Sequence, residues 1–213
     1  MSRHDLASSP QQAIEHVLND LRRSRPVVLV DDVSPVRNGC LVFAAELATP
    51  ELVALAVRHT SGFLCVTLTE RNANRLDLPP LQRVHSRPDG RTYAVAVDAR
   101  DGVTTGISGR DRARTAQILA DPNSTSAHLI RPGHMVPIRI SAGGVLDNPG
   151  LAEAAHDLVV LSGARPAAVL ADLVSVGDPT QMATTTELKQ FSHWNGIALA
   201  TVQDAMRLRD GDR

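Results

Sequence analysis

Apolar residues recur along the chain with two periods, which predict helices and strands. Ile14, Val17 and Leu21 share one face of a helix, and Ser9 with Pro10 would begin it as N-cap and first helical residue. Short β-branched runs such as residues 26–31 predict buried strands instead. By these signals we expect helices at residues 10–21, 50–59, 110–120, 151–161 and 186–195, strands at 26–31, 41–45, 63–69, 93–97, 136–140, 167–174 and 197–202, and a loop at 78–90.

The predicted elements follow one another without a linker or an internal repeat. The 213 residues suit a single domain with a full core. We therefore expect one compact α+β domain with α/β-type layers over residues 1–213, frayed at 1–8 and 209–213. Only 2% of residues are aromatic, so Ala, Val, Leu and Ile must build the core.

Charge and cysteine content narrow the classes of partner. The net charge is -1, with no basic excess, which argues against nucleic acid. No apolar run is long enough to span a membrane, and residues 1–10 lack the apolar stretch of a signal peptide. The two cysteines are too few for a disulfide framework. We expect a cytoplasmic protein that binds a small molecule, and neither nucleic acid nor a membrane.

Seven phrases occur in one order along nearly the whole chain. They are Val30-Asp31-Asp32, LVFAAE at 41–46, RHTSG at 58–62, DGVTTGIS at 101–108, Asp111-Arg112, RPGH at 131–134 and AGGVL at 142–146. Their order and spacing resemble the 3,4-dihydroxy-2-butanone-4-phosphate synthase family of riboflavin biosynthesis. The resemblance implies a compact α+β fold that pairs as a homodimer, with active sites at the interface. The cyclohydrolase domain fused to some relatives is not expected here, because the chain ends too soon.

The family reaction takes ribulose 5-phosphate to a four-carbon dihydroxybutanone phosphate and formate. It passes through enolisation, dehydration, a carbon skeleton shift and C–C cleavage. The resemblance implies a divalent cation that polarises oxygens and stabilises the enediolate, and carboxylates that move protons.

Two segments depart from the family pattern at its metal-binding positions. The resemblance places Val36 where the family has a ligand glutamate, with Pro35 and Cys40 in place of the neighbouring arginine and aspartate. No carboxylate occurs from Val33 to Ala45 that could substitute. Leu151 stands in place of the ligand histidine.

The phosphate-binding positions also differ, because Asn148 and Ala152 replace an arginine and a threonine. His156 lies five positions beyond Leu151 and would point about 140° away on a helix. Magnesium requires hard oxygen ligands, so we expect no metal site and no cofactor. The substitutions make the pocket more apolar, which favours a non-phosphorylated ligand.

Four residues are candidates for acid/base chemistry. Asp31 and Asp32 end a predicted strand at the family's pocket, although they could instead cap a loop. His134 matches a substrate-contacting histidine of the family and has a suitable pKa range; a structural hydrogen bond is the alternative. Asp172 stands at a catalytic glutamate position, one methylene shorter.

The candidate substrate-binding residues fall in two groups. Thr104, Thr105 and Ser108 lie in a glycine-bearing turn whose backbone and hydroxyls could bind an anion, or could only shape the turn. Val36, Cys40 and Leu151 would line the more apolar pocket. Cys40 could be a nucleophile, but a lone cysteine beside a strand is more often core filler.

Three functions remain open. The first, which we expect, is a repurposed, metal-independent acid/base enzyme acting on a less polar, non-phosphorylated substrate in specialised biosynthesis. The second is a non-catalytic homologue that binds a ligand or an active partner subunit. The third is an ordinary synthase of the family, which would have to use other ligands.

Overall fold

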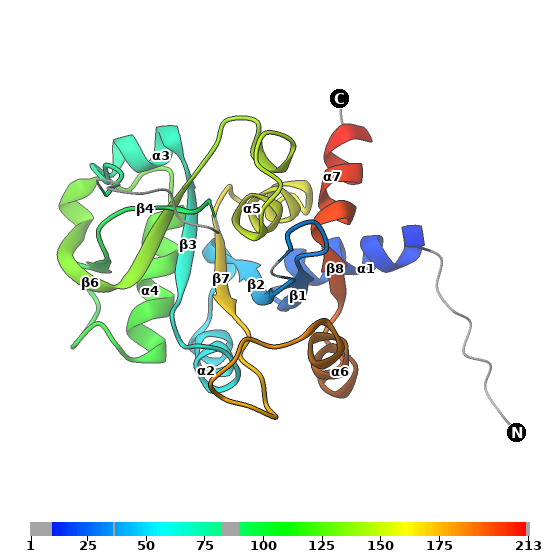
Figure 1. The fold of residues 1–213 in the computed structure, drawn as a ribbon. Helices are drawn as coiled ribbons and strands as arrows, with labels where there is room; N and C mark the ends of the chain where they lie inside the picture. Colours follow the sequence, from blue (N-terminus) through cyan, green and yellow to red (C-terminus); the bar gives the residue numbers. More distant parts are fainter. Residues whose placement is uncertain (1–9, 36, 82–89, 212–213) are drawn as a thin grey trace, which may run out of the picture.

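A mixed sheet forms the centre of the molecule (Figure 1). The computed structural model describes residues 10–35, 37–81 and 90–211. The strands lie in the order β4-β6-β3-β7-β2-β1-β8, and β5 pairs with β6. Their bounds are β1 (Val27–Val30), β2 (Gly39–Ala44), β3 (Cys65–Thr69), β4 (Thr92–Tyr93), β5 (Val97–Ala99), β6 (Leu129–Ile140), β7 (Ala168–Asp172) and β8 (Leu199–Thr201).

Helices cover both faces of the sheet (Figure 1). Apolar residues of α2, α4 and α6 join one buried cluster, and those of α1, α5 and α7 join a second. None of the helices in the described ranges is long and apolar enough to cross a membrane. The helices are α1 (Pro10–Arg22), α2 (Pro50–His59), α3 (Glu70–Arg75), α4 (Gly109–Ala120), α5 (Leu151–Leu161), α6 (Thr185–Asn195) and α7 (Val202–Gly211), with short 3-10 turns at Ala45–Leu47, Ser126–His128 and Gly144–Leu146.

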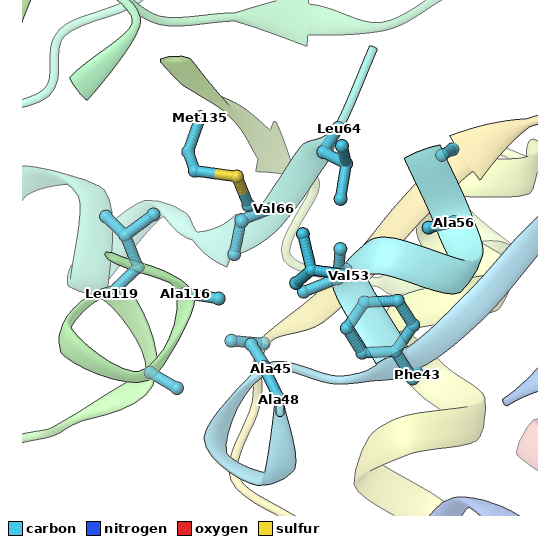
Figure 2. Close-up of a cluster of buried hydrophobic side chains, with 14 of the residues drawn as sticks. Phe43, Ala45, Ala48, Val53, Ala56, Leu64, Val66, Ala116, Leu119 and Met135 are labelled. Atoms are coloured by element: carbon cyan, nitrogen blue, oxygen red, sulfur yellow. The ribbon is translucent and has the colours of Figure 1, made fainter. Parts of the chain in front are cut away.

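The two clusters follow from the alternation of side chains along each strand. In β2, Leu41 and Phe43 belong to the first cluster, whereas Cys40 and Val42 belong to the second. Figure 2 shows the first cluster, where Phe43 is the one aromatic ring among the labelled aliphatic side chains. Each fully buried Leu or Val contributes about 1.5–3 kcal/mol, so an aromatic-poor core is held together by many small contributions.

The strand directions bring several loops to one end of the sheet. Val30 ends β1 opposite Gly39 at the start of β2, and Cys40 pairs with Asp172 at the end of β7. Cys65 starts β3 beside β7, and Ser61 before it donates its N–H to the carbonyl of Asp172. We call this the Asp172 end. At the opposite end, the parallel strands β3 and β6 finish together at Thr69 and Ile140; we call it the Ile140 end.

Most predicted elements are present, and the α+β domain with α/β-type layers is confirmed. Three differences stand out. Helices α3 and α7 were not predicted, because each begins directly after a strand with no intervening loop. The strand expected at 93–97 is two short strands, and residues 209–211, expected to be frayed, end α7. Of the loop expected at 78–90, residues 82–89 lie outside the described residues.

Candidate active site

Asp31 and Asp32 lie at the Asp172 end directly after β1, but each carboxylate has a structural partner. Asp31 Oδ1 accepts hydrogen bonds from the backbone N–H of Val33, at 3.1 Å, and of Ser34, at 2.8 Å. Asp32 Oδ1 accepts from the N–H of Gln203 in the first turn of α7, at 3.1 Å. Both contacts are typical of caps that satisfy otherwise unpaired amides. The structure therefore favours the capping alternative for this pair.

Asp172 forms a two-bond ion pair with Arg91. The two guanidinium nitrogens of Arg91 donate to the two carboxylate oxygens of Asp172 at 2.7 and 2.8 Å. Burial alone would lower the pKa of the Arg91 guanidinium, but the hydrogen bonds and charge of Asp172 raise it above its ordinary value. Such a bidentate pair is strong and fixes the plane of the carboxylate. Asp172 remains partly accessible, with 21% of its side chain exposed.

Cys40 lies beside this pair, directly across from Asp172 in the sheet. Its side chain is fully buried in the second hydrophobic cluster. Burial, and then the charge of Asp172, raise the pKa of the Cys40 thiol well above its ordinary value. A nucleophilic cysteine requires a lowered pKa, so Cys40 packs as a small apolar residue here. Val36, the other residue predicted from this loop, lies outside the described residues.

The first turn of α5 approaches the same end of the sheet. Leu151 is the first residue of α5, and its side chain is buried in the second cluster. Asn148 donates from its amide to Glu153 Oε1 at 2.8 Å. Burial raises the pKa of the Glu153 carboxyl, and the charge of Arg91 acts in the opposite direction. Leu151 therefore belongs to the core, while Glu153 is the ionisable group that α5 places near Arg91.

His134 is held by a carboxylate that the sequence analysis did not select. Its Nδ1 lies 2.8 Å from Asp98 Oδ2, and its backbone N–H donates to Asp98 Oδ1 at 2.9 Å. Asp98 is buried, with 5% of its side chain exposed, whereas His134 shows 37%. An ionised carboxylate can only accept, so Nδ1 carries the proton and Nε2 is left to face a ligand.

The glycine-bearing turn packs directly against this pair. A Cβ added to Gly106 would lie 1.9 Å from Asp98 Oδ2 and 2.9 Å from His134 Nδ1, and its φ is +84°. Only glycine therefore fits. Thr104 Oγ1 and the N–H of Gly106 both donate to Asp111 Oδ2, at 2.8 and 3.1 Å.

The three hydroxyls of the predicted anion-binding turn differ in their hydrogen bonds. Thr104 is committed to Asp111, and Ser108 is the N-cap of α4, accepting from the N–H of Asp111. Burial alone would raise the pKa of the Asp111 carboxyl, but the hydrogen bonds lower it overall. Thr105 is exposed. Of the three predicted residues, Thr105 alone keeps a hydroxyl available to a ligand, and the others shape the turn.

Arg112 connects the two halves of the site. It is buried in α4 and donates to the carbonyl of Gly62, at 3.3 Å, in the loop whose Ser61 contacts Asp172. The Arg112 Nε is buried and has no hydrogen-bond partner among the described residues. Burial lowers the pKa of the Arg112 guanidinium, and the charge of Asp98 opposes this. The loop at residues 60–64 thus contacts Asp172 through Ser61 and Arg112 through Gly62.

The described residues do not by themselves form a cation site. Within the described ranges, no group of three or more His, Cys, Asp or Glu side chains could hold a metal ion. Asp31, Asp32 and Asp172 have their carboxylates engaged by backbone amides or by Arg91. Magnesium takes oxygen ligands in near-octahedral order and is usually held by only one or two carboxylates, with waters in the remaining positions.

Arg91, Asp98 and Arg112 are the site residues that sequence reasoning did not assign. A signal existed for Asp98, because it interrupts an apolar run at residues 94–99 and an unpaired buried charge is costly. Arg91 gave no comparable signal, since it follows a loop. Its pairing with Asp172 joins residues 81 positions apart.

Comparisons with known proteins agree on one family. A family model described as 3,4-dihydroxy-2-butanone 4-phosphate synthase matches residues 15–208. The riboflavin biosynthesis protein RibBA of Salinispora arenicola is 49% identical over 196 residues, which cover 92% of this chain and 46% of that protein. The chain thus spans about half the length of the curated relatives it matches.

Solved structures show the same likeness. The 3,4-dihydroxy-2-butanone 4-phosphate synthase of Candida albicans has a TM-score of 0.84 and 36% identity, covering 92% of this chain and 96% of that one. A synthase of the same name in complex with two magnesium ions has a TM-score of 0.83 and 36% identity, covering 90% and 93%.

These comparisons overturn the main functional prediction. A repurposed enzyme of specialised biosynthesis is contradicted, because the relative at 49% identity is named for riboflavin biosynthesis. The prediction of a lost metal site conflicts with the same relatives and with the magnesium complex. The substitutions at Pro35, Cys40 and Leu151 were given too much weight against similarity that extends over 92% of the chain.

Proposed function

Because the chain belongs to the 3,4-dihydroxy-2-butanone 4-phosphate synthase family, we propose that it converts ribulose 5-phosphate to 3,4-dihydroxy-2-butanone 4-phosphate and formate. The identity of 49% to a riboflavin biosynthesis protein supports this reaction. The structural observation that carries it is the His134–Asp98 pair, a proton-transfer device at the Asp172 end. The proposal concerns this one reaction and not the remaining half of the longer relatives.

His134 is the group that moves protons in this proposal. Enolisation requires a base that removes a proton from carbon and an acid that protonates oxygen. With Nδ1 bonded to Asp98, the Nε2 lone pair of a neutral His134 can accept the proton. The Asp98 carboxylate then stabilises the imidazolium that forms, as a carboxylate does in other acid/base dyads.

Asp172 and Arg91 form the second functional pair of the proposal. The two hydrogen bonds from Arg91 fix the orientation of the Asp172 carboxylate. Its partly exposed oxygens can accept a substrate hydroxyl, and the exposed hydroxyl of Thr105 offers a further contact across the loop.

We further propose that the protein is a homodimer with active sites at the interface, acting in the cytoplasm. Large apolar side chains are exposed around the Asp172 end, among them Phe63 at 50% and Ile107 at 53%. A subunit interface would bury such groups. Both cysteines are free, which suits a reducing compartment. Sedimentation at micromolar concentration tests the dimer, and a mass of 22.8 kDa would contradict it.

Formate release tests the reaction. Purified protein is incubated with ribulose 5-phosphate and Mg²⁺, and formate is followed with a coupled dehydrogenase. We expect turnover on the order of 1 s⁻¹ or somewhat below, and loss of activity in His134→Asn but not in His193→Asn on the exposed side of α6. Formate at the level of the no-enzyme control would contradict the proposal.

A non-catalytic homologue that binds a ligand or an active partner subunit is the second candidate. The observation that favours it is the engagement of Asp31, Asp32 and Asp172 by other groups of the protein. Calorimetry with ribulose 5-phosphate separates the two candidates. Binding without formate release supports the second, and binding with release supports the first.

A further inference from the structure

A separate cavity of about 460 Å³ opens at the Ile140 end, away from the Asp172 end. It lies where the parallel strands β3 and β6 finish, beyond Thr69 and Ile140. Its walls come from the start of α3, the turn at 141–144, and the side of α5 that carries His156 and Asp157. Ligands of α/β proteins often bind beyond the carboxyl ends of parallel strands, and this volume suits a small organic molecule.

His156 presents a hydrogen-bond donor to this cavity. Thr67 Oγ1 accepts from the N–H of Ala168 at 2.8 Å and lies 3.0 Å from His156 Nδ1. Thr67 is fully buried, and its hydroxyl proton has no other acceptor among the described residues. The proton is therefore directed at Nδ1, which makes Nδ1 the acceptor and places the ring proton on Nε2. The residue is only 5% exposed, and its Nε2 has no hydrogen-bond partner among the described residues. Because His156 lines the cavity, this Nε2–H is available to an acceptor atom of a ligand.

The ring is neutral, which sets the kind of atom that it can bind. Burial, and then the charge of Arg209, lower the pKa of His156 to about 4. At neutral pH the Nε2–H therefore acts as a neutral donor whose partner must be an acceptor, such as an oxygen.

The acidic groups of the cavity already have partners. Asp157 Oδ2 accepts from the N–H of Val145 at 2.9 Å and lies 3.7 Å from Arg209 Nε. Glu70 lies 3.6 Å from Arg139. Arg71 also lines the cavity; it is exposed, and no partner is found for it among the described residues. The donors still available are thus the Nε2–H of His156 and the Arg71 guanidinium.

The remaining walls are apolar. Ile140, Ala142, Val160 and Pro166 line the cavity beside these donors. We propose that this cavity is a second binding site, which takes a small organic oxyanion whose phosphate or carboxylate oxygens accept from His156 and Arg71 and whose carbon skeleton packs on Ile140, Val160 and Pro166. The site is independent of the reaction proposed for the Asp172 end.

Benzyl phosphate is a suitable probe, because it combines a phosphate with an apolar ring, and benzyl alcohol is its neutral counterpart. Calorimetry should show saturable binding of benzyl phosphate and at least tenfold weaker binding of benzyl alcohol. His156→Phe keeps the ring volume without the donor and should weaken binding about tenfold. Arg71→Gln should weaken it two- to fivefold, whereas the controls His193→Phe and Arg23→Gln, at exposed positions elsewhere, should leave it unchanged.

Nitrogen-15 NMR of the unmodified protein tests the donor even if His156→Phe does not fold. We expect the His156 ring to carry its proton on Nε2 and its resonances to shift on titration with benzyl phosphate. A proton on Nδ1, or a ring signal that does not respond, would overturn the proposal. So would an absence of saturable binding at millimolar concentration. Binding that is lost in His134→Asn and retained in Arg71→Gln would assign the probe to the Asp172 end and equally overturn it.

Discussion

His134 and His156 lie at opposite ends of the β3–β6 strand pair, and their surroundings give them opposite properties. His134 is partly exposed and bonded to the carboxylate of Asp98, whereas His156 is buried and bonded to the hydroxyl of Thr67. The Asp98 carboxylate orients the partly exposed His134 ring for proton transfer, whereas burial disfavours the protonated form of the His156 ring. One histidine is thus suited to carry a proton, and the other to remain a neutral donor.

The difference shows that residue type alone does not identify a catalytic group. Both histidines were visible in the sequence, and His156 was considered there only as a poor replacement for the family's ligand histidine, whose place Leu151 takes. The two histidines differ in the group that each ring contacts, which is a carboxylate for His134 and a hydroxyl for His156. They also differ in the chain segments that pack around each ring. Gly106 packs against the His134 pair, and Ala168 of β7 engages Thr67 beside His156.

The largest expected effect is the loss of the proton carrier at the Asp172 end. His134→Asn should lower kcat for formate release about 10²- to 10⁴-fold, which is the usual contribution of a positioned acid/base group. His156→Asn, at the other end, should change kcat by less than about threefold in the folded protein. Equal losses in the two variants would remove the functional distinction between the two ends.

The pH dependence of stability should reveal the second histidine. Because the folded-state pKa of His156 is about 4, below the unfolded value of about 6.5, the unfolded chain binds an extra proton between these values. The contribution of His156 to the free energy of unfolding is fully present above about pH 6.5. Between about pH 6.5 and about pH 4 it falls by about 1.4 kcal/mol per pH unit of acidification.

The carboxyls of Glu153 and Asp157 act in the opposite direction in the acid part of this window, because burial raises the pKa of each. The measurement is therefore a difference between the wild type and His156→Phe in urea unfolding at pH 7.0, 6.0 and 5.0. The variant should lose the His156 contribution to the slope. Parallel pH profiles would show that His156 binds a proton equally in both states.

Gly106→Ala should destabilise the Asp172 end more than an otherwise similar glycine substitution. The new Cβ would meet Asp98 and His134, and overpacking typically costs about 1–3 kcal/mol. Gly163→Ala is a matched control, because its φ of +87° is similar and nothing lies within 4 Å of its Cβ position. Urea unfolding should show a larger loss of unfolding free energy for Gly106→Ala than for Gly163→Ala. Equal losses would mean that the positive φ, and not contact with Asp98 and His134, causes the destabilisation.

The smallest expected effect is that of substituting Ser108. This substitution tests whether Ser108 caps α4 or contacts a ligand. Ser108→Ala removes the acceptor for the N–H of Asp111 and should cost about 1 kcal/mol of stability. Thr184→Ala removes the N-cap of α6 and serves as the control. Neither variant should change KM for ribulose 5-phosphate. A selective rise of KM in Ser108→Ala would restore Ser108 as a substrate contact.

The sequence by itself determined most of the element order, the family and several site positions. Helix α5 was predicted with its observed bounds, Leu151–Leu161, because its apolar residues and preceding glycine are local signals. His134 was selected from a phrase shared with the family and Asp172 from its place on a predicted strand where the family has a glutamate, and both lie at the Asp172 end. These features depend on residues close together in the chain.

Only the tertiary structure decided what the candidate residues contact. Asp98 lies 36 positions from His134, and Arg91 lies 81 from Asp172, so no local pattern could pair them. The capping roles of Asp31 and Asp32 likewise depend on the turn after β1 and on the start of α7. Charge pairing and burial act through space, and the fold sets those distances. The role of each ionisable residue was therefore decided by the chain segments that the sheet brings to its two ends.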